Sequence, residues 1–330
     1  MSKLEHWLDQ NIPNLSGKTA VITGANSGIG YEAARMLAIK DARVVLAVRN
    51  TVKGGKAARE LRSIVPQANL EVMDLDLASL ASIRSFAALF MAGHDRLDLL
   101  INNAGVMAIP RRKTIDGFEM QFGVNHLGHF ALTGLLLPLL QRAPGARVVT
   151  ISSGMHRFGE INFGDLNSTR SYQKWSAYSQ SKLANLLFAY ELQRKLAAAG
   201  NGVSSIAAHP GYAATNLQAG GSDRSDSSLQ ARALAVLNRV VAQSAEMGAL
   251  PTIYAAASPV VQGGDYIGPG GPMEQRGWPV KVQSNGRSHD DAGAARLWAM
   301  SEELTGVCYD IPAAAAQGLD PQGLEIPVLT

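Results

Sequence analysis

The sequence predicts an α/β fold built on one doubly wound parallel sheet, Rossmann-like, with helices on both faces. Short apolar segments alternate along the chain with longer segments of helical period. The apolar segments are rich in β-branched residues and lack polar alternation, which is typical of strands buried on both sides. Hydrophobic residues make up 46% of the 330 residues and charged residues 17%, so the chain can bury a large core.

The elements follow in order along the chain. Strands are predicted at residues 18–23, 43–48, 70–75, 97–102, 147–152 and 203–208. Helices are predicted between them, the clearest at 29–39 and 51–65, and a later one at 292–304. The stretch 262–291 is rich in Gly, Pro and polar residues and is expected to be a long surface segment. We expect a single domain over 1–330, with a core at about 17–266 and a C-terminal extension at about 267–330.

Composition excludes several classes of protein. Thirty Lys+Arg stand against 27 Asp+Glu with no dense basic tract, so we expect no nucleic-acid partner. A single cysteine, Cys308, permits neither an intrachain disulfide nor a thiolate metal cage and suits a cytoplasmic location. Residues 1–18 lack the apolar stretch of a signal peptide. The most apolar stretch, 130–140, is short and contains Pro138, so we expect a buried helix and no membrane anchor.

A glycine-rich segment between the first strand and the first helix predicts a phosphate-binding loop. Glycines let the backbone turn tightly and approach a diphosphate, and the helix N-terminus attracts its charge. The alternative is an ordinary strand-to-helix turn, because the spacing differs from the commonest dinucleotide fingerprint. The residues expected to contact the cofactor here are Thr23, Gly24, Asn26, Ser27, Gly28, Ile29 and Gly30.

The end of the second strand indicates which dinucleotide binds. An acidic residue at this place would accept the ribose hydroxyls of NAD, but the chain has Arg49 and Asn50 there. A guanidinium can bind a 2′-phosphate with two hydrogen bonds. NADP(H) is therefore preferred and NAD(H) is the alternative, unless Arg49 is an ordinary surface residue at the end of a strand.

Tyr178 and Lys182 lie four residues apart and therefore on one face of a helix. A nearby ammonium stabilises a phenolate and lowers its pKa, so such a tyrosine can exchange a proton near neutral pH. This spacing alone is common on protein surfaces, so the prediction of a catalytic role depends on further residues. These are Asn125 within a helix and the pair Ser152 and Ser153 at the end of the fifth strand.

With these residues in view, the chain resembles the short-chain dehydrogenase/reductase superfamily. The resemblance runs from about residue 17 to 266, with all motifs in the expected order. The long gap between Ser153 and Tyr178, His156, and the segment 181–185 are similar to the branch of retinol dehydrogenases and WW-domain oxidoreductases. Many retinol dehydrogenases carry an N-terminal membrane anchor, which we do not expect here.

The resemblance implies the catalytic roles. Tyr178 would be the general acid in carbonyl reduction and the base in alcohol oxidation. Lys182 would lower the pKa of Tyr178 and bind the nicotinamide ribose, and Ser153 would polarise the substrate oxygen. The backbone carbonyl of Asn125 would hold a water linked to Lys182. Ser152 is the less favoured alternative to Ser153.

The resemblance also implies further contacts with the cofactor. These would come from Asp76, Leu77, Asn103, Ala104, Gly105, Pro210, Gly211 and Thr215, whereas Asp74 is expected to be only a strand-end residue. The substrate would meet Met107, Met155, His156 and Tyr212, with Phe158 nearby, although each of these could equally be a core or loop residue. Residues 213–235 would form a substrate lid, or else an ordinary surface loop.

Metal binding is not expected. His126 and His129 lie three residues apart on one helix, but no third ligand accompanies them at a recognisable spacing. Packing or hydrogen bonding is the favoured interpretation of both residues.

These observations predict an NAD(P)-dependent oxidoreductase that interconverts a carbonyl and an alcohol on a small, fairly apolar substrate. The first alternative is a non-catalytic protein that binds NADP as a sensor or interaction module. The second is a reductase of carbon–carbon double bonds. A homodimer that pairs through the helices of Asn125 and Tyr178 is expected by analogy with the family.

Overall fold

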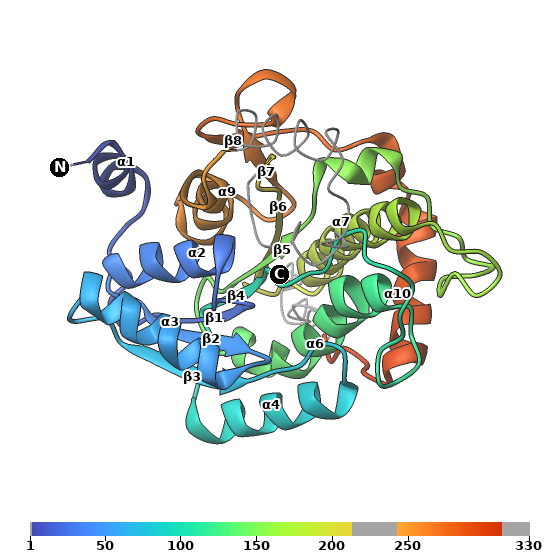
Figure 1. Ribbon diagram of the computed structural model, residues 1–330, viewed down its shortest axis with the longest axis horizontal. Coiled ribbons are helices and arrows are strands. Elements are labelled where there is room, and N and C mark those ends of the chain that lie inside the picture. The colour runs from blue at the N-terminus through green and yellow to red at the C-terminus, as the bar shows by residue number, and fades with distance from the viewer. Residues whose placement is uncertain (1, 213–242, 312–330) are drawn as a thin grey trace, which may run out of the picture.

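The computed structural model of the protein describes residues 2–212 and 243–311 (Figure 1). One eight-stranded sheet runs through it in the order β3-β2-β1-β4-β5-β6-β7-β8. The strands are β1 (Thr19–Thr23), β2 (Arg43–Val48), β3 (Leu70–Asp74), β4 (Leu99–Asn102), β5 (Arg147–Ile151), β6 (Ser204–Ala208), β7 (Tyr266–Pro269) and β8 (Pro279–Lys281). All neighbours are parallel except β7 and β8, so the predicted α/β fold with a doubly wound sheet is confirmed and an antiparallel edge strand is added.

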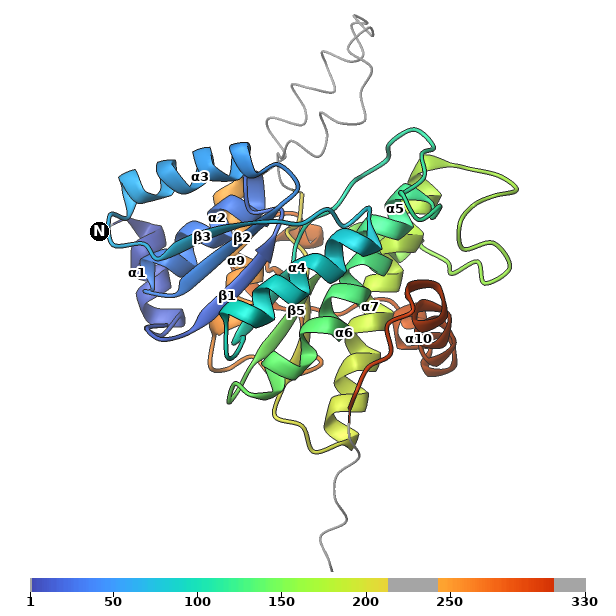
Figure 2. The same ribbon diagram turned by 90° about the horizontal axis from the view of Figure 1, so that it is seen from below.

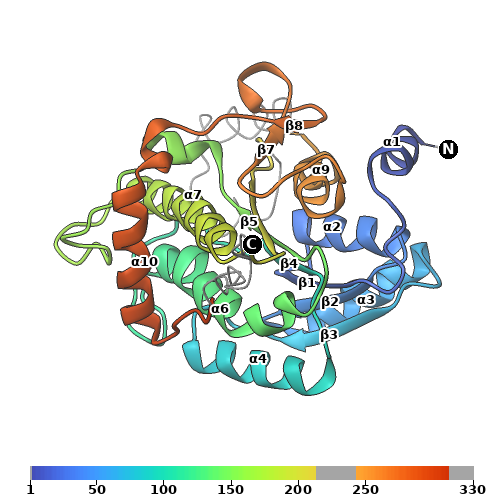
Figure 3. The same ribbon diagram turned by 180° about the vertical axis from the view of Figure 1, so that it is seen from behind.

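Helices cover both faces of the sheet (Figures 1 and 3). One face carries α2 (Gly28–Ile39), α3 (Thr51–Ile64) and α9 (Ala245–Ala257), with α1 (Lys3–Asn11) packed beside them. The other carries α4 (Leu80–Gly93), α6 (Gly128–Gln141) and α7 (Lys174–Ala198). Successive strand residues point to opposite faces: Ala20 and Ile22 join the first core, and Val21 joins the second.

The strand order reverses between β1 and β4, the two central strands that each begin one half of the fold. In open α/β sheets, ligands bind beyond the carboxyl ends of the strands at such a switch point. The glycine loop follows β1, Asn103–Gly105 follow β4, and Ser153 follows β5, so the fold brings three predicted motifs to one edge of the sheet.

The stretch 262–291 is not simply a surface segment, and this part of the prediction was wrong. It contains β7, β8 and two short helical turns, η3 (Pro272–Glu274) and η4 (Gly286–His289). The sheet therefore extends past residue 266, where the core was expected to end. The two strands are short and hold Gly or Pro, and pairing with β6, a contact distant in sequence, makes them strands.

The apolar stretch at 130–140 belongs to a longer helical run. It continues from α5 (Met120–Phe122) through a π turn, η1 (Gly123–Leu127), into α6. This run of 22 residues is long enough to cross a membrane, and its most apolar 18-residue stretch has a mean hydropathy of 1.2. However, 83% of its most apolar stretch is buried inside the protein, as expected for a core helix.

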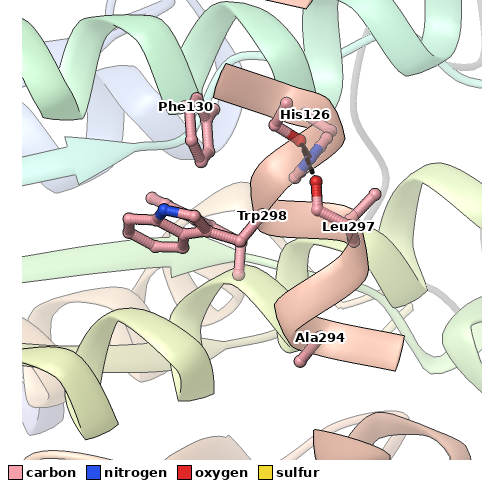
Figure 4. Close-up of a pocket in the computed structure, with 7 residues that line it drawn as sticks. His126, Phe130, Ala294, Leu297 and Trp298 are labelled. Carbon is pink, nitrogen blue, oxygen red and sulfur yellow. Dashed lines mark hydrogen bonds between the residues drawn. The ribbon is translucent and has the colours of Figure 1, made fainter. Parts of the chain in front are cut away.

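Helix α10 (Asp291–Thr305) lies beside α7 and α6 on the outside of the molecule (Figure 2). Its Leu297 and Trp298 face His126 and Phe130, and Ser301 is hydrogen-bonded to His126 at 2.9 Å (Figure 4). The prediction of a docked helix at 292–304 is confirmed. A further short helical turn, η2 (Gly154–Phe158), follows β5 and leads away from Ser153.

Candidate active site

The loop after β1 has a backbone that only glycine accommodates well. Gly24 has a φ of +70°, in the left-handed region. A Cβ atom on Gly30 would lie 2.5 Å from Asn103 Nδ2 and 2.7 Å from the carbonyl oxygen of Gly24. Ser27 begins α2 without a side-chain cap, so its side chain does not occupy the first-turn N–H groups. The loop thus offers a narrow cradle of backbone that suits a dinucleotide diphosphate.

Thr23 ties this loop to the end of β4. Its hydroxyl accepts hydrogen bonds from the backbone N–H groups of Asn103 and Ala104, each at 2.9 Å. The Asn103 amide in turn donates to the Thr23 carbonyl at 2.8 Å. The residues predicted to contact the cofactor from β1 and from β4 therefore form one hydrogen-bonded unit.

The residues beyond β2 and β3 differ in how freely they could meet a ligand. Arg49 is exposed, and within the described residues no ion pair or hydrogen bond engages its guanidinium. The Asn50 side chain instead caps α3 by accepting from Lys53 N–H at 2.9 Å. Asp76 accepts from Ala78 N–H through Oδ1, and Leu77 packs where a Cβ on Gly128 would otherwise fall.

Tyr178 and Lys182 lie on the face of α7 that is turned toward β5. Both are buried, with 6% and 5% of their surface exposed. The Lys182 ammonium lies 5.7 Å from the centroid of the Tyr178 ring, and the Ser153 hydroxyl lies close enough to the Tyr178 hydroxyl to lower its pKa. A strand end and a helix that is distant in sequence thus bring three of the four predicted catalytic residues together.

In this structure burial, and not the charge of Lys182, has the largest influence on the pKa of Tyr178. Burial raises the pKa of Tyr178 to about 12, and the hydrogen bond from Ser153 opposes that shift. Burial also lowers the pKa of Lys182 to about 8. The Lys182 ammonium donates to the Ile151 carbonyl at 3.1 Å.

Asn125 occupies the π turn η1, and its side chain is fully engaged. Its Oδ1 accepts from Val106 N–H at 2.8 Å, and its Nδ2 donates to the Val106 carbonyl and to Ser181 Oγ, each at 2.9 Å. A Cβ on Gly105 would come within 3.1 Å of Asn125 Oδ1 and 3.6 Å of Lys182 Nζ. Asn125 thus connects the loop after β4 with α7.

The two serines after β5 have different surroundings. Ser152 is buried and its hydroxyl donates to the Lys182 carbonyl at 2.8 Å. Ser153 is partly exposed and begins η2, where its hydroxyl accepts from Met155 N–H at 3.3 Å. Of the two, only Ser153 presents its hydroxyl to Tyr178, which favours it as the residue that meets a substrate oxygen.

His156 was considered as a residue that borders the substrate, and its geometry favours the structural alternative. It is buried, with Nδ1 2.7 Å from the Ser153 carbonyl and Nε2 accepting from Asn285 N–H at 3.3 Å. Burial lowers its pKa to about 4, so it is neutral at physiological pH. Its ring packs edge-on against Tyr266. Met107, Met155 and Tyr212 are partly exposed.

Trp175 lies beside Tyr178 and was not among the residues predicted from the sequence. Its indole meets the Tyr178 ring edge-on at 6.4 Å between centroids, and 41% of the residue is exposed. Phe158 on η2 is 75% exposed. The spacing of three residues between Trp175 and Tyr178 was the available signal, since such residues share a helix face.

The segment after β6 is held by the β7–β8 connection. Gly211 has a φ of +65°, and a Cβ there would lie 2.4 Å from the Gln275 carbonyl. Glu274 joins this connection to His209 at 3.1 Å and to Arg157 at 2.9 Å. The Pro210 carbonyl accepts from Gln243. Thr215 and the predicted lid at 213–235 lie outside the described residues.

Among the described residues, no group of three or more His, Cys, Asp or Glu side chains could hold a metal ion. His126 and His129 point in different directions: His126 bonds Ser301 on α10, and His129 bonds Thr23 at the end of β1.

Comparison with known proteins identifies the family. The family model described as short chain dehydrogenase matches residues 18–225. The chain is a short-chain dehydrogenase. It is 43% identical to retinol dehydrogenase 14 of Mus musculus over 89% of this chain and 87% of the relative, and 41% identical to human retinol dehydrogenase 12 over 90% and 89%. The resemblance to this branch is therefore confirmed.

Solved structures agree with this assignment. An uncharacterized protein from Mycobacterium Paratuberculosis is 45% identical, with a TM-score of 0.75, and the match covers 91% of this chain and 97% of that chain. The NADP complex of RhlG from Pseudomonas aeruginosa is 25% identical, with a TM-score of 0.61 over 77% and 94%. As a short-chain dehydrogenase, the protein is an NAD(P)-dependent oxidoreductase that acts on CH–OH groups.

Proposed function

We propose that this short-chain dehydrogenase uses NADP(H) to interconvert a carbonyl and an alcohol on a small, fairly apolar substrate, with Tyr178 as general acid and base. One observation carries the proposal: the Ser153 hydroxyl lies close enough to the buried Tyr178 hydroxyl to lower its pKa, and the Lys182 ammonium lies 5.7 Å from the centroid of the Tyr178 ring. Two hydroxyl groups can thus meet one substrate oxygen at the edge of the sheet where the glycine loop opens.

Each residue then has a defined task. When bound, the nicotinamide supplies the hydride for reduction or accepts it in oxidation. Ser153 donates a hydrogen bond to the substrate oxygen and stabilises the negative charge that develops there. Tyr178 gives its proton to that oxygen in reduction and removes it in oxidation. Because the Tyr178 pKa is about 12, its phenol is protonated at neutral pH and ready to act as the acid.

Lys182 and Asn125 support that proton transfer. The Lys182 ammonium would bind the nicotinamide ribose and favour the phenolate through its charge. Asn125 lies against Gly105 and Ser181, so it links the loop after β4 to the helix that carries Tyr178. The remaining cofactor contacts that we propose are those predicted from the sequence.

Arg49 supports the preference for NADP(H). It is exposed at the end of β2, where a 2′-phosphate would lie when the diphosphate is on the glycine loop. A guanidinium stabilises the phosphate there, whereas a carboxylate would repel it. The described complex of RhlG, which is 25% identical, holds NADP.

The walls near Tyr178 support an apolar substrate. Trp175 exposes its indole beside the Tyr178 ring, and Phe158 is exposed on η2, the short turn after Ser153 that also carries Met155. The retinol dehydrogenases that this chain resembles are named for an apolar alcohol. An alcohol or aldehyde attached to a hydrocarbon skeleton is the class of substrate that we propose.

The proposal includes one domain that works in the cytoplasm without a membrane anchor or a nucleic-acid partner. The burial of the apolar run from Met120 to Gln141 supports this location, because that run packs into the protein core. The single cysteine, Cys308, is free, as a reducing compartment would leave it.

The test is oxidation of NADPH with a panel of aldehydes, ketones, quinones and compounds with conjugated double bonds, followed by product analysis. Tyr178→Phe is the matched variant, because it removes one oxygen and keeps the ring that packs on Trp175. We expect carbonyl reduction that falls by about 100- to 10,000-fold in the variant while NADPH still binds. Undiminished turnover would contradict the role of Tyr178, and reduced double bonds would favour the other reductase chemistry. Firm NADPH binding without turnover on any compound would favour the non-catalytic alternative.

A further inference from the structure

His129 lies between the glycine loop after β1 and the helical run that carries Asn125, and it has no part in the reaction described above. It is buried on α6, one helical turn after Asn125. Its Nε2 is 2.9 Å from the Thr23 hydroxyl, and its Nδ1 is 3.0 Å from the Asn125 carbonyl oxygen. Both ring nitrogens are thus engaged, each with a different part of the proposed site.

The hydrogen-bond partners fix which nitrogen carries the proton. A carbonyl oxygen only accepts, so Nδ1 must donate to Asn125. The Thr23 hydroxyl already accepts from the N–H groups of Asn103 and Ala104, and of the two acceptors within reach of its own proton, His129 Nε2 at 2.9 Å is nearer than the Ile101 carbonyl at 3.4 Å. The ring is therefore neutral with its proton on Nδ1, and burial favours the same neutral form because it lowers the pKa of His129 to about 4.

The Asn125 carbonyl belongs to a π turn, in which Gly128 N–H bonds back five residues to the Gly123 carbonyl. Such turns depart from the α-helical pattern, and a side-chain donor can then set the direction of a carbonyl that the regular pattern would otherwise hold. The Asn125 side chain is tied to Val106 and Ser181, and the His129 bond holds the backbone carbonyl of the same residue.

We propose that His129 is a positioning residue that couples the cofactor loop to the catalytic helices, holding the Asn125 carbonyl through Nδ1–H and the Thr23 hydroxyl through Nε2. The inference rests on the proposed function, since Asn125 is assigned there to the proton-transfer machinery. When a bound dinucleotide displaces Thr23, Asn103 or Ala104, the His129 ring transmits that displacement to Asn125.

Two isosteric variants separate the two bonds. The amide of His129→Asn falls near the Nδ1 position and keeps a donor for Asn125, whereas that of His129→Gln falls near Nε2 and keeps an acceptor for Thr23. We expect His129→Gln to lower kcat by about 10- to 100-fold, with the Kd of NADPH changed by less than about threefold. His129→Asn is expected to stay within about threefold of the original kcat.

His126→Asn is the control for loss of a buried histidine, because His126 bonds Ser301 on α10 and is not joined to Thr23. It should lower the melting temperature while leaving kcat per folded molecule within about threefold. The proposal would be overturned if both His129 variants lost kcat equally and in proportion to their folded fraction. Their activity would then also keep the pH profile of the unmodified protein.

Nuclear magnetic resonance of the unmodified protein with ¹⁵N-labelled histidine gives a test that needs neither variants nor turnover. The proposal requires the Nδ1–H tautomer for His129, and ring resonances that shift when NADP⁺ is added. The Nε2–H tautomer, or a ring unaffected by NADP⁺ that binds, would overturn it. If no substrate is turned over, only the proposed function fails, since the tautomer and its response to NADP⁺ still decide the role of His129.

Discussion

Lys182 places an ammonium group inside the protein, and at the residue scale this position opposes stability. An unfolded lysine has a pKa near 10.5, and burial lowers that of Lys182 to about 8. The charged form is therefore disfavoured by folding. The unfavourable contribution is fully present below about pH 8 and fades as the pH rises toward 10.5.

Lys182→Met should consequently stabilise the cofactor-free protein while abolishing turnover. The difference between 10.5 and about 8 corresponds to roughly 3 kcal/mol, an upper value because the variant also loses the bond to the Ile151 carbonyl. Urea unfolding at about pH 7 and about pH 10 measures it, and the gain should be larger at the lower pH. A gain that is independent of pH would mean that the charge is not its cause.

Arg49 offers a residue-scale test of cofactor choice. Arg49→Glu replaces the exposed guanidinium with a carboxylate that repels a 2′-phosphate and can accept ribose hydroxyls. We expect kcat/KM for NADPH to fall by about 100-fold and that for NADH to rise, because a charge-assisted bidentate contact becomes a repulsion. Steady-state rates with both cofactors measure this, with Arg59→Glu on α3 as the control for adding an acid nearby. Parallel losses for NADPH in both variants would indicate a long-range charge effect instead.

At the same scale, the sequence was informative about residue type and less so about surroundings. A sequence pattern identifies the four predicted catalytic residues. The pKa of Tyr178, however, depends on how deeply α7 is buried, and no local sequence pattern predicts that depth. His156 lies three residues after Ser153, yet its ring turns to Tyr266 and Asn285, partners more than 100 residues away.

At the scale of elements, the turn from β1 into α2 depends on Gly30. Gly30→Ala would place a methyl group 2.5 Å from Asn103 Nδ2 and 2.7 Å from a backbone oxygen, so the loop must move. We expect a loss of about 1–3 kcal/mol in stability and a smaller stabilisation by added NADPH. Thermal unfolding with and without NADPH measures both.

Gly93→Ala is the matched control for that experiment. A Cβ at Gly93, the last residue of α4, meets nothing within 4 Å. It should be neutral or stabilise by up to about 1 kcal/mol. If Gly93→Ala lost the stabilisation by NADPH to the same extent, the effect of Gly30→Ala could not be assigned to the close contacts of its methyl group.

The long elements were predictable because each contains its own signal. The first six strands match to within two residues, and α10 matches to within one at each end. Strands β7 and β8 have four and three residues and gain their structure from tertiary pairing, so period and composition could not find them. The π turn at Asn125 could not be predicted from the sequence either, because ordinary helical residues flank it on both sides.

At the scale of the whole molecule, α10 changes the expectation of a homodimer. Pairing was predicted through the helices of Asn125 and Tyr178, but α10 packs along α7, with Ala294 and Leu297 in the same core as Leu183 and Leu187. The surface that a partner would need is therefore partly covered by the chain itself.

We expect a monomer in sedimentation velocity experiments. Trp298→Ala should loosen α10, because this indole packs on Phe130, Phe188 and Tyr309, and its loss should cost about 3–5 kcal/mol. Self-association that increases in this variant would agree with a covered surface. A stable dimer of the unmodified protein would show that pairing uses another face or accommodates α10.

The apolar helical run from Met120 to Gln141 also has a consequence for synthesis of the chain. The elements that cover it include α7 and α10, and both follow it in the sequence. A ribosome therefore releases a segment apolar enough for a bilayer before the residues that will enclose it exist. We expect the nascent chain to be most prone to aggregation in the interval before α7 has emerged.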